Sequence, residues 1–287
     1  MGLIVGILIV IGCTLGGYAA MGGHLAVLWQ PFEGVIIVGA AVGAFVIGNT
    51  GSVIKATAGT VAKTLRGSQY SKENYIELIS LLYQILKVAK TKGNLGLEKH
   101  IESPHESALF QQFPGVLANH TAITFMCDYL RMMTLGSDDP HEMETLMDEE
   151  IEVVHHEHSE VAHALQTMAD GMPALGIVAA VLGVIKTMGS ITEPPEILGK
   201  LIGGALVGTF LGVWLSYGFL APIATKAQSI YNLEIKYLYC IKAALLAHMH
   251  GSPPVVSVEF ARKALHSHDR PTFYEVEDAV GALPPPA

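Results

Sequence analysis

Four long apolar segments interrupt an otherwise polar chain, and they predict four membrane-spanning helices. The clearest pair covers residues 171–189 and 201–221. A helix of about 20 residues spans about 30 Å, the hydrocarbon thickness of a bilayer. Two further segments, 2–21 and 33–54, are almost free of charge. No charged segment precedes the apolar run of residues 2–21, so we expect a retained helix and not a cleaved signal peptide.

Small residues recur every four positions in the central pair of segments. Gly204, Gly208 and Gly212 form one stripe, and Gly176 and Ala180 form another. Small residues at this spacing let helix backbones approach closely in lipid, where burial of apolar side chains gives no net drive to associate. Both helices are therefore predicted to pack against other helices.

Two polar regions complete the predicted architecture, which is an all-α membrane protein. We expect residues 1–54 to form the first two transmembrane helices and residues 55–170 a large helical cytoplasmic domain. Residues 171–225 then form the third and fourth transmembrane helices, and residues 226–287 a cytoplasmic helical tail that extends the fourth helix. The chain should end in disorder at Pro284–Pro286.

Local signals subdivide the cytoplasmic domain. An apolar pattern of three- and four-residue steps predicts a helix over 70–92, which ends at Gly93. Ser103–Glu106 and Asp139–Glu142 each combine a capping side chain, a proline and a glutamate, a pattern typical of helix starts. The second start opens a long helix that we expect to continue into the third membrane span.

Basic residues indicate the topology. Only Lys186 and Lys200 of the 17 lysines and arginines lie in or near the short connections at 22–33 and 190–200. The positive-inside rule then assigns the large domain, both termini and the tail to the cytoplasm.

Composition narrows the classes of function. Hydrophobic residues make up 51% of the chain and charged residues 15%, with 30 glycines, which favours packed membrane helices. A net charge of −9 argues against nucleic acid as a partner. The chain lacks a phosphate-binding loop and a Gly-x-Ser-x-Gly nucleophile, so we expect no enzyme and an ion gradient as the energy source.

The segment Glu152–His163 is the strongest candidate for a metal site, because it contains Glu-x-x-His twice. Carboxylate-bridged metal pairs need this motif on two different helices, whereas both copies here lie on one. We therefore interpret the segment as a titratable helix face and expect no metal.

Two prolines and one threonine stand out in the apolar pair. Pro173 and Pro222 each lie about one turn from the predicted cytoplasmic end of a span, either as simple kinks or as a matched pair of hinges. The Thr209 hydroxyl either bonds its own i−4 carbonyl or lines an ion path. The spans hold no internal Asp or Glu, and Asp170 lies at the interface. A proton carrier within the bilayer needs an ionisable group, so a partner would have to supply it.

A charged cluster lies where the first cytoplasmic helices meet. It contains Lys90, Lys92, Glu98, Lys99 and Glu102. Such a cluster is either solvated surface or a contact patch for a charged partner, where electrostatics favour fast and reversible engagement.

Taken together, several motifs resemble the MotA family of flagellar stator subunits, from the first helix to about residue 280. The matching stretches are Gly16–Tyr18, Glu77–Tyr83, Met147–Glu152, Pro173–Ala180, Val207–Gly212, Tyr217–Phe219 and Val258–Lys263.

The resemblance implies a ring of five subunits around two MotB helices, which supply the membrane aspartate and anchor the unit to the cell wall. It implies that Thr209, Ala180 and Tyr217 line the ion path beside the MotB helices, and that Pro173 and Pro222 transmit torque. Alanine at position 180, where sodium-driven relatives carry threonine, favours protons as the coupling ion, with no other cofactor.

The resemblance also assigns roles to charged residues. Lys90 and Glu98 match the pair that meets the rotor protein FliG, although arginine is usual at the first position and lysine lacks its planar fork. Glu150 and Asp170 match acidic positions with lesser roles. Two alternatives stay open: an ExbB/TolQ-like energiser of outer-membrane processes, which typically has three spans, and a membrane scaffold without conduction.

Overall fold

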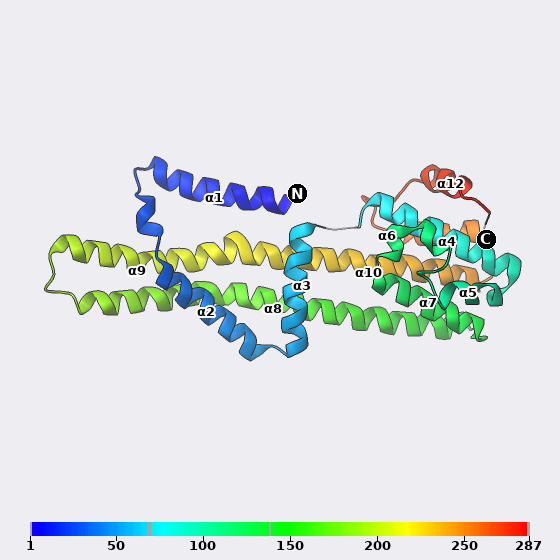
Figure 1. The fold of residues 1–287 in the computed structure, drawn as a ribbon, viewed down its shortest axis with the longest axis horizontal. Coiled ribbons are helices and arrows are strands. Elements are labelled where there is room, and N and C mark those ends of the chain that lie inside the picture. Colours follow the sequence, from blue (N-terminus) through cyan, green and yellow to red (C-terminus); the bar gives the residue numbers. More distant parts are fainter. Residues whose placement is uncertain (1, 68–69, 138, 286–287) are drawn as a thin grey trace. The chain divides into compact units, whose positions relative to one another are not determined.

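The computed structural model describes residues 2–67, 70–137 and 139–285, and within these ranges every regular element is a helix (Figure 1). The chain forms two compact units, and two long helices, α8 (Pro140–Met188) and α10 (Ala221–Met249), each contribute residues to both. We call residues 2–67 and 157–229 the membrane unit, because each of the four helices long enough and apolar enough to cross a membrane lies in it wholly or in part. Residues 70–156 and 230–285 are the helical-core unit. The predicted all-α class with four apolar helices is confirmed.

The membrane unit begins with two apolar helices joined by a short connection. Its elements are α1 (Gly2–Ala20), the 3₁₀ turn η1 (Leu25–Leu28), α2 (Pro31–Gly48), α3 (Gly51–Arg66), the second part of α8, α9 (Pro195–Leu215), the π turn η4 (Ser216–Leu220) and the start of α10.

The predicted second span over 33–54 is wrong at its C-terminal end. Helix α2 stops at Gly48, Asn49 is extended, and the separate amphipathic helix α3 begins at Gly51 and leaves in a different direction (Figure 1). The Asn49 side-chain amide donates to the Phe45 carbonyl at 2.7 Å, which satisfies one of the carbonyls exposed where α2 ends.

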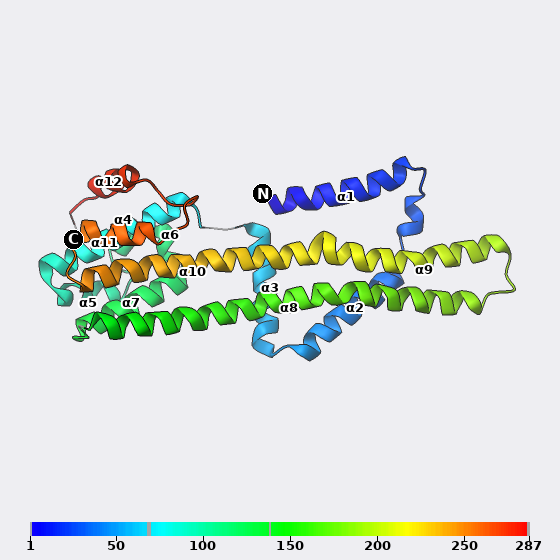
Figure 2. The same ribbon diagram turned by 180° about the vertical axis from the view of Figure 1, so that it is seen from behind.

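The two small-residue stripes pack against each other, with α8 and α9 side by side in both views of this unit (Figure 1 and Figure 2). A Cβ added to Gly212 would lie 2.7 Å from the Gly176 Cα atom, and one added to Gly208 would lie 3.1 Å from the Ala180 nitrogen. The close packing predicted for these helices is therefore confirmed, and their partners are each other.

The helical-core unit is built around α4 (Lys72–Lys92), which buries eleven residues. The other elements are η2 (Asn94–Leu97), α5 (Glu98–Ile101), η3 (Phe110–Gln112), α6 (Pro114–Leu117), α7 (His120–Thr134), the first part of α8, the second part of α10, α11 (Pro254–Lys263) and α12 (Phe273–Gly281). The predicted helix over 70–92 is confirmed, as is its end at Gly93, which has φ of 74°. Glycine reaches this left-handed region without steric cost.

Of the two predicted helix starts, one is confirmed and one is wrong. Helix α8 begins at Pro140, and the Asp139 carboxylate accepts from the His141 N–H at 2.8 Å. Ser103–Glu106 instead forms a turn, in which the Ser107 N–H donates to the Ser103 carbonyl at 3.0 Å. The Ser107 side chain pairs with the buried His100 ring, and this tertiary contact replaces a continuing helix.

The predicted disorder at Pro284 is also wrong. The Pro284 carbonyl accepts a 2.7 Å hydrogen bond from the side-chain amide of the buried Gln84 on α4. A buried amide needs a partner, so this contact attaches the end of the tail to the core. Pro286 lies outside the described residues.

Candidate functional site

The site residues predicted for the membrane unit lie along the α8–α9 pair and its continuation. Pro173 and Ala180 are on α8, Thr209 is on α9, Tyr217 is in η4 and Pro222 is the second residue of α10. The contact of Gly208 and Gly212 with the Gly176–Ala180 stripe, which we call the glycine contact, holds α8 and α9 close together. No acidic side chain lies between residues 197 and 221.

Thr209 is half-buried on α9, and among the described residues its hydroxyl makes no hydrogen bond. The neighbouring helices contain the alternative arrangement: the Thr187 hydroxyl donates to the Gly183 carbonyl at 2.8 Å, and the Thr225 hydroxyl to the Ala221 carbonyl at 3.1 Å. The self-bonded interpretation of Thr209 is therefore wrong here. Its hydroxyl stays available to donate to or accept from a group outside the chain.

Pro173 lies within α8, which continues without interruption on both sides. Because proline has no N–H, the carbonyl four residues earlier, that of Ala169, loses its helical partner. Ala169 is fully buried, and an unsatisfied buried carbonyl costs about 1–3 kcal/mol. The Ser216 hydroxyl donates to this carbonyl at 2.6 Å.

Pro222 follows directly after the π turn η4. The Ala221 N–H donates to the Ser216 carbonyl, five residues earlier, instead of to the i−4 carbonyl. Single π turns within α-helices are frequent at functional sites. Trp214, which precedes this turn, donates its indole N–H to the Thr14 hydroxyl on α1 at 3.2 Å.

Ser216 is a residue that the sequence analysis missed. It is fully buried, and it contributes to both proline regions. A serine near the end of an apolar segment gives no signal of its own, since the carbonyl that it bonds is 47 residues away.

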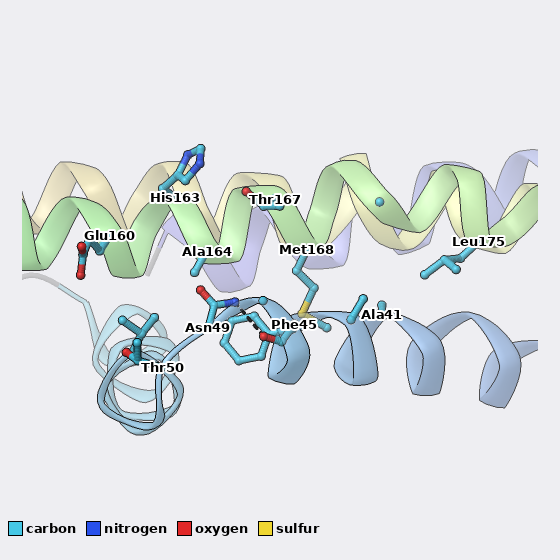
Figure 3. A pocket seen from close by; sticks show the side chains of 14 residues that line it. Ala41, Phe45, Asn49, Thr50, Glu160, His163, Ala164, Thr167, Met168 and Leu175 are labelled. Atoms are coloured by element: carbon cyan, nitrogen blue, oxygen red, sulfur yellow. Dashed lines mark hydrogen bonds between the residues drawn. The ribbon is translucent and has the colours of Figure 1, made fainter.

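A cleft of about 440 Å³ lies between α2, the start of α3 and residues 160–175 of α8. Figure 3 shows Met168 extending from α8 toward Phe45 and Ala41 of α2, with Glu160 and His163 further along α8. The wall is mainly apolar. Its polar side chains are those of Asn49, Thr50, Glu160, His163 and Thr167.

Lys90 and Glu98 are both exposed in the helical-core unit, at the end of α4 and the start of α5. Burial lowers the pKa of His248 in the same unit, and the nearby charge of Lys90 lowers it further. Arg131 pairs with Glu102 at 2.8 Å, so charges of both signs share this end of the unit, next to an exposed Leu95. The surface can meet a partner that also carries both signs of charge.

Two acidic candidates are engaged in local hydrogen bonds. The Tyr129 hydroxyl donates to the Glu150 carboxylate at 2.7 Å, and the Gln166 amide donates to the Asp170 carboxylate at 2.8 Å. The segment Glu152–His163 lies on α8, and no three His, Cys, Asp or Glu side chains converge on a metal-sized site in the part of the chain that the structure describes.

Comparisons with known proteins point in one direction. The family "Motility protein A N-terminal" matches residues 4–93, and the MotA/TolQ/ExbB proton channel family matches residues 118–239. Motility protein A of Salmonella typhimurium is 43% identical over 98% of this chain and 95% of its own length, and that of Escherichia coli is 42% identical over 99% and 96%.

Solved structures share the fold. MotAB of C. jejuni superposes with a TM-score of 0.79 at 19% identity, over 94% of this chain and 98% of that chain. The flagellar MotAB stator complex of Bacillus subtilis gives 0.73 at 24% identity, over 93% and 96%. With identities above 40% to two relatives over almost its whole length, the chain belongs to the motility protein A family.

Proposed function

We propose that this chain is a stator subunit of a bacterial flagellar motor, which couples inward proton flow to torque on the rotor. The observation that carries the proposal is the α8–α9 pair. Residues 171–188 of α8 and 197–215 of α9 are largely apolar, contain no Asp or Glu, and include the available Thr209 hydroxyl and Pro173, while Pro222 follows in α10. The identity to motility protein A along the whole chain favours this function over an ExbB/TolQ-like energiser or a scaffold without conduction.

Because the apolar parts of α8 and α9 contain no carboxylate, the first partner has to supply one. A MotB-type dimer would supply the membrane aspartate, in keeping with the MotAB complexes whose fold this chain shares. Large apolar side chains of α8 and α9 are exposed in the single chain, among them Ile177, Val181, Leu206 and Val213. Lipid, the partner's helices and neighbouring copies in a ring of five would cover them.

The proposed topology has four spans in the inner membrane, formed by α1, α2, the second part of α8, and α9. Both termini, residues 55–170 and residues 226–287 are cytoplasmic. The distribution of lysine and arginine supports this orientation. Lys90 and Glu98 then face the rotor protein FliG, and fast reversible contacts suit their exposed positions.

The proposed mechanism needs no cofactor besides the proton and forms no covalent intermediate. A proton from outside neutralises the partner's aspartate next to Thr209, Ala180 and Tyr217. The loss of charge changes the contacts of that helix with α8 and α9, and Pro173 and Pro222 pass the change to the helical-core unit. One charge that crosses 100 mV releases about 2.3 kcal/mol, enough to rearrange a few surface contacts.

Two measurements test the function in a bacterium that lacks its own stators and co-expresses the chain with its MotB-type partner. Swimming in sodium-free medium should persist and should stop on addition of a protonophore; rotation that continued would contradict proton coupling. Pro173→Ala should accumulate in the membrane but lose torque, and Ala174→Gly is the neighbouring control. Normal torque of Pro173→Ala would exclude the hinge role.

A further inference from the structure

Pro173 removes one backbone hydrogen-bond donor from α8. Its missing N–H leaves the Ala169 carbonyl without a helical partner, one turn before the proline. Ala169 is fully buried, and lipid offers no replacement donor. A donor for this carbonyl must therefore come from another element.

Ser216 supplies that donor from the π turn. Its hydroxyl lies 2.6 Å from the Ala169 carbonyl oxygen, and its side chain is fully buried. Its own carbonyl accepts the Ala221 N–H, which is the last backbone donor before Pro222. One residue thus bonds to the backbone at both proline regions.

We propose that Ser216 is a positioning residue that ties the π turn before Pro222 to the Pro173 region of α8, so that the two proline sites change conformation together. This inference rests on the proposed stator function. A bend at Pro173 moves the Ala169 carbonyl, so the Ser216 hydroxyl must move with it or the hydrogen bond must break. In either case Ser216 shifts, and its own carbonyl, which accepts the Ala221 N–H, moves the backbone next to Pro222. The coupling is short, because it involves two hydrogen bonds and no other side chain.

The bond to the carbonyl makes a specific prediction for double substitutions. In Pro173→Ala the residue at 173 regains its N–H, which can bond the Ala169 carbonyl within the helix. Ser216→Ala should then lower the unfolding midpoint of the purified complex when Pro173 is present, and should lower it much less in the Pro173→Ala background. Coupling of this kind is what a double-mutant cycle measures. Equal shifts in the two backgrounds would overturn the proposal.

The torque of single stator units separates positioning from simple stability. Loss of a buried hydrogen bond shifts a two-state equilibrium by about 5- to 100-fold, so we expect the speed gained per stator unit at high load to fall about fivefold or more in Ser216→Ala. Ser216→Thr keeps the hydroxyl and should stay within about twofold of the original speed. Thr225→Ala is the matched control, since that exposed hydroxyl bonds only its own helix.

The outcomes distinguish this inference from the proposed function. If the unchanged chain drives no rotation with its partner, the stator function fails. If it does, and Ser216→Ala accumulates and rotates normally, only the positioning role fails. A Ser216→Ala chain that does not accumulate in the membrane at all would also overturn it, because the bond would then serve folding.

Discussion

The two units differ in how many of their apolar side chains are buried within the single chain. In the helical-core unit, α4 alone buries eleven residues, including Leu82 at 0% exposure. In the membrane unit, α1 buries none and α2 buries only Ile37 and Ala41. The first unit completes its core within one chain, as a soluble domain does. The second leaves its apolar surface to lipid and to other helices, so it is completed only by assembly.

The largest effect should come from the core of the helical-core unit. Leu82→Ala removes a fully buried side chain from α4 and should lower the free energy of unfolding by about 2–5 kcal/mol, because a cavity remains. We expect little of this variant to accumulate, and a clearly lower midpoint of thermal unfolding for the protein that does. Ile177→Ala, at a side chain that is 56% exposed on α8, is the membrane-unit control and should accumulate normally. If both variants lost the same amount of accumulated protein and of thermal stability, the two units would not differ in where burial stabilises the chain.

An intermediate effect should come from the close contact between Gly212 of α9 and Gly176 of α8, where the two helix backbones nearly touch. A Cβ at Gly212 would lie 2.7 Å from both the Gly176 Cα atom and the Met172 carbonyl oxygen. Gly212→Ala must therefore separate α8 from α9, at a cost of about 1–3 kcal/mol. Gly43→Ala on α2 meets nothing within 4 Å and is the matched control.

Recovery of the intact complex with its partner after detergent extraction measures this effect. Gly212→Ala should reduce recovery, whereas Gly43→Ala should not. A normal yield for Gly212→Ala would mean that the contact between α8 and α9 adjusts freely, which contradicts the tight packing described above.

The same contrast explains what the sequence could predict. Periodicity and capping identified α4 and the start of α8, because these features are local. The small-residue stripes also predicted close helix packing, since spacing alone decides which residues share a helix face. The stripes did not reveal their partners, which are each other, in the contact between α8 and α9.

The misses occur where a single side-chain hydrogen bond, local or between distant segments, decides the course of the backbone. The end of α2 depends on the Asn49 amide, which competes for a helix carbonyl within an otherwise apolar run. The turn at Ser103 depends on the bond between Ser107 and His100, which are seven residues apart, whereas the tail binds Gln84, 200 residues away in the chain. Ser216 is invisible for the same reason, because its bond joins two segments through a proline defect. Individual side-chain hydrogen bonds override the propensity of the segment, and hydrophobic periodicity does not record them.

The smallest effect should be a pH dependence carried by the helical-core unit. His100 is 4% exposed, its Nδ1 lies 2.7 Å from the Ser107 hydroxyl, and its buried Nε2 has no hydrogen-bond partner among the described residues. Burial lowers the pKa of His100 from its ordinary 6.5, and the charges of Lys99 and Lys92 lower it further. Between pH 6.5 and the lower pKa that His100 has in the folded state, the unfolded chain therefore binds more protons than the folded chain. The contribution of His100 to the free energy of unfolding is therefore fully present above pH 6.5 and is lost as the pH falls.

The loss can reach at most about 1.4 kcal/mol per pH unit for one group. Thermal unfolding of the purified complex at pH 7.5 and pH 5.5 measures it, and His100→Gln should flatten the difference because glutamine does not titrate. The exposed His105, five residues along the same connection, is the matched control, and His105→Gln should leave the slope unchanged. If the pH dependence of stability in His100→Gln equalled that of the unchanged chain, another group would have to cause it. If that group lay in the membrane unit, the pH-dependent part of the stability would belong to the assembled helices and not to the helical-core unit.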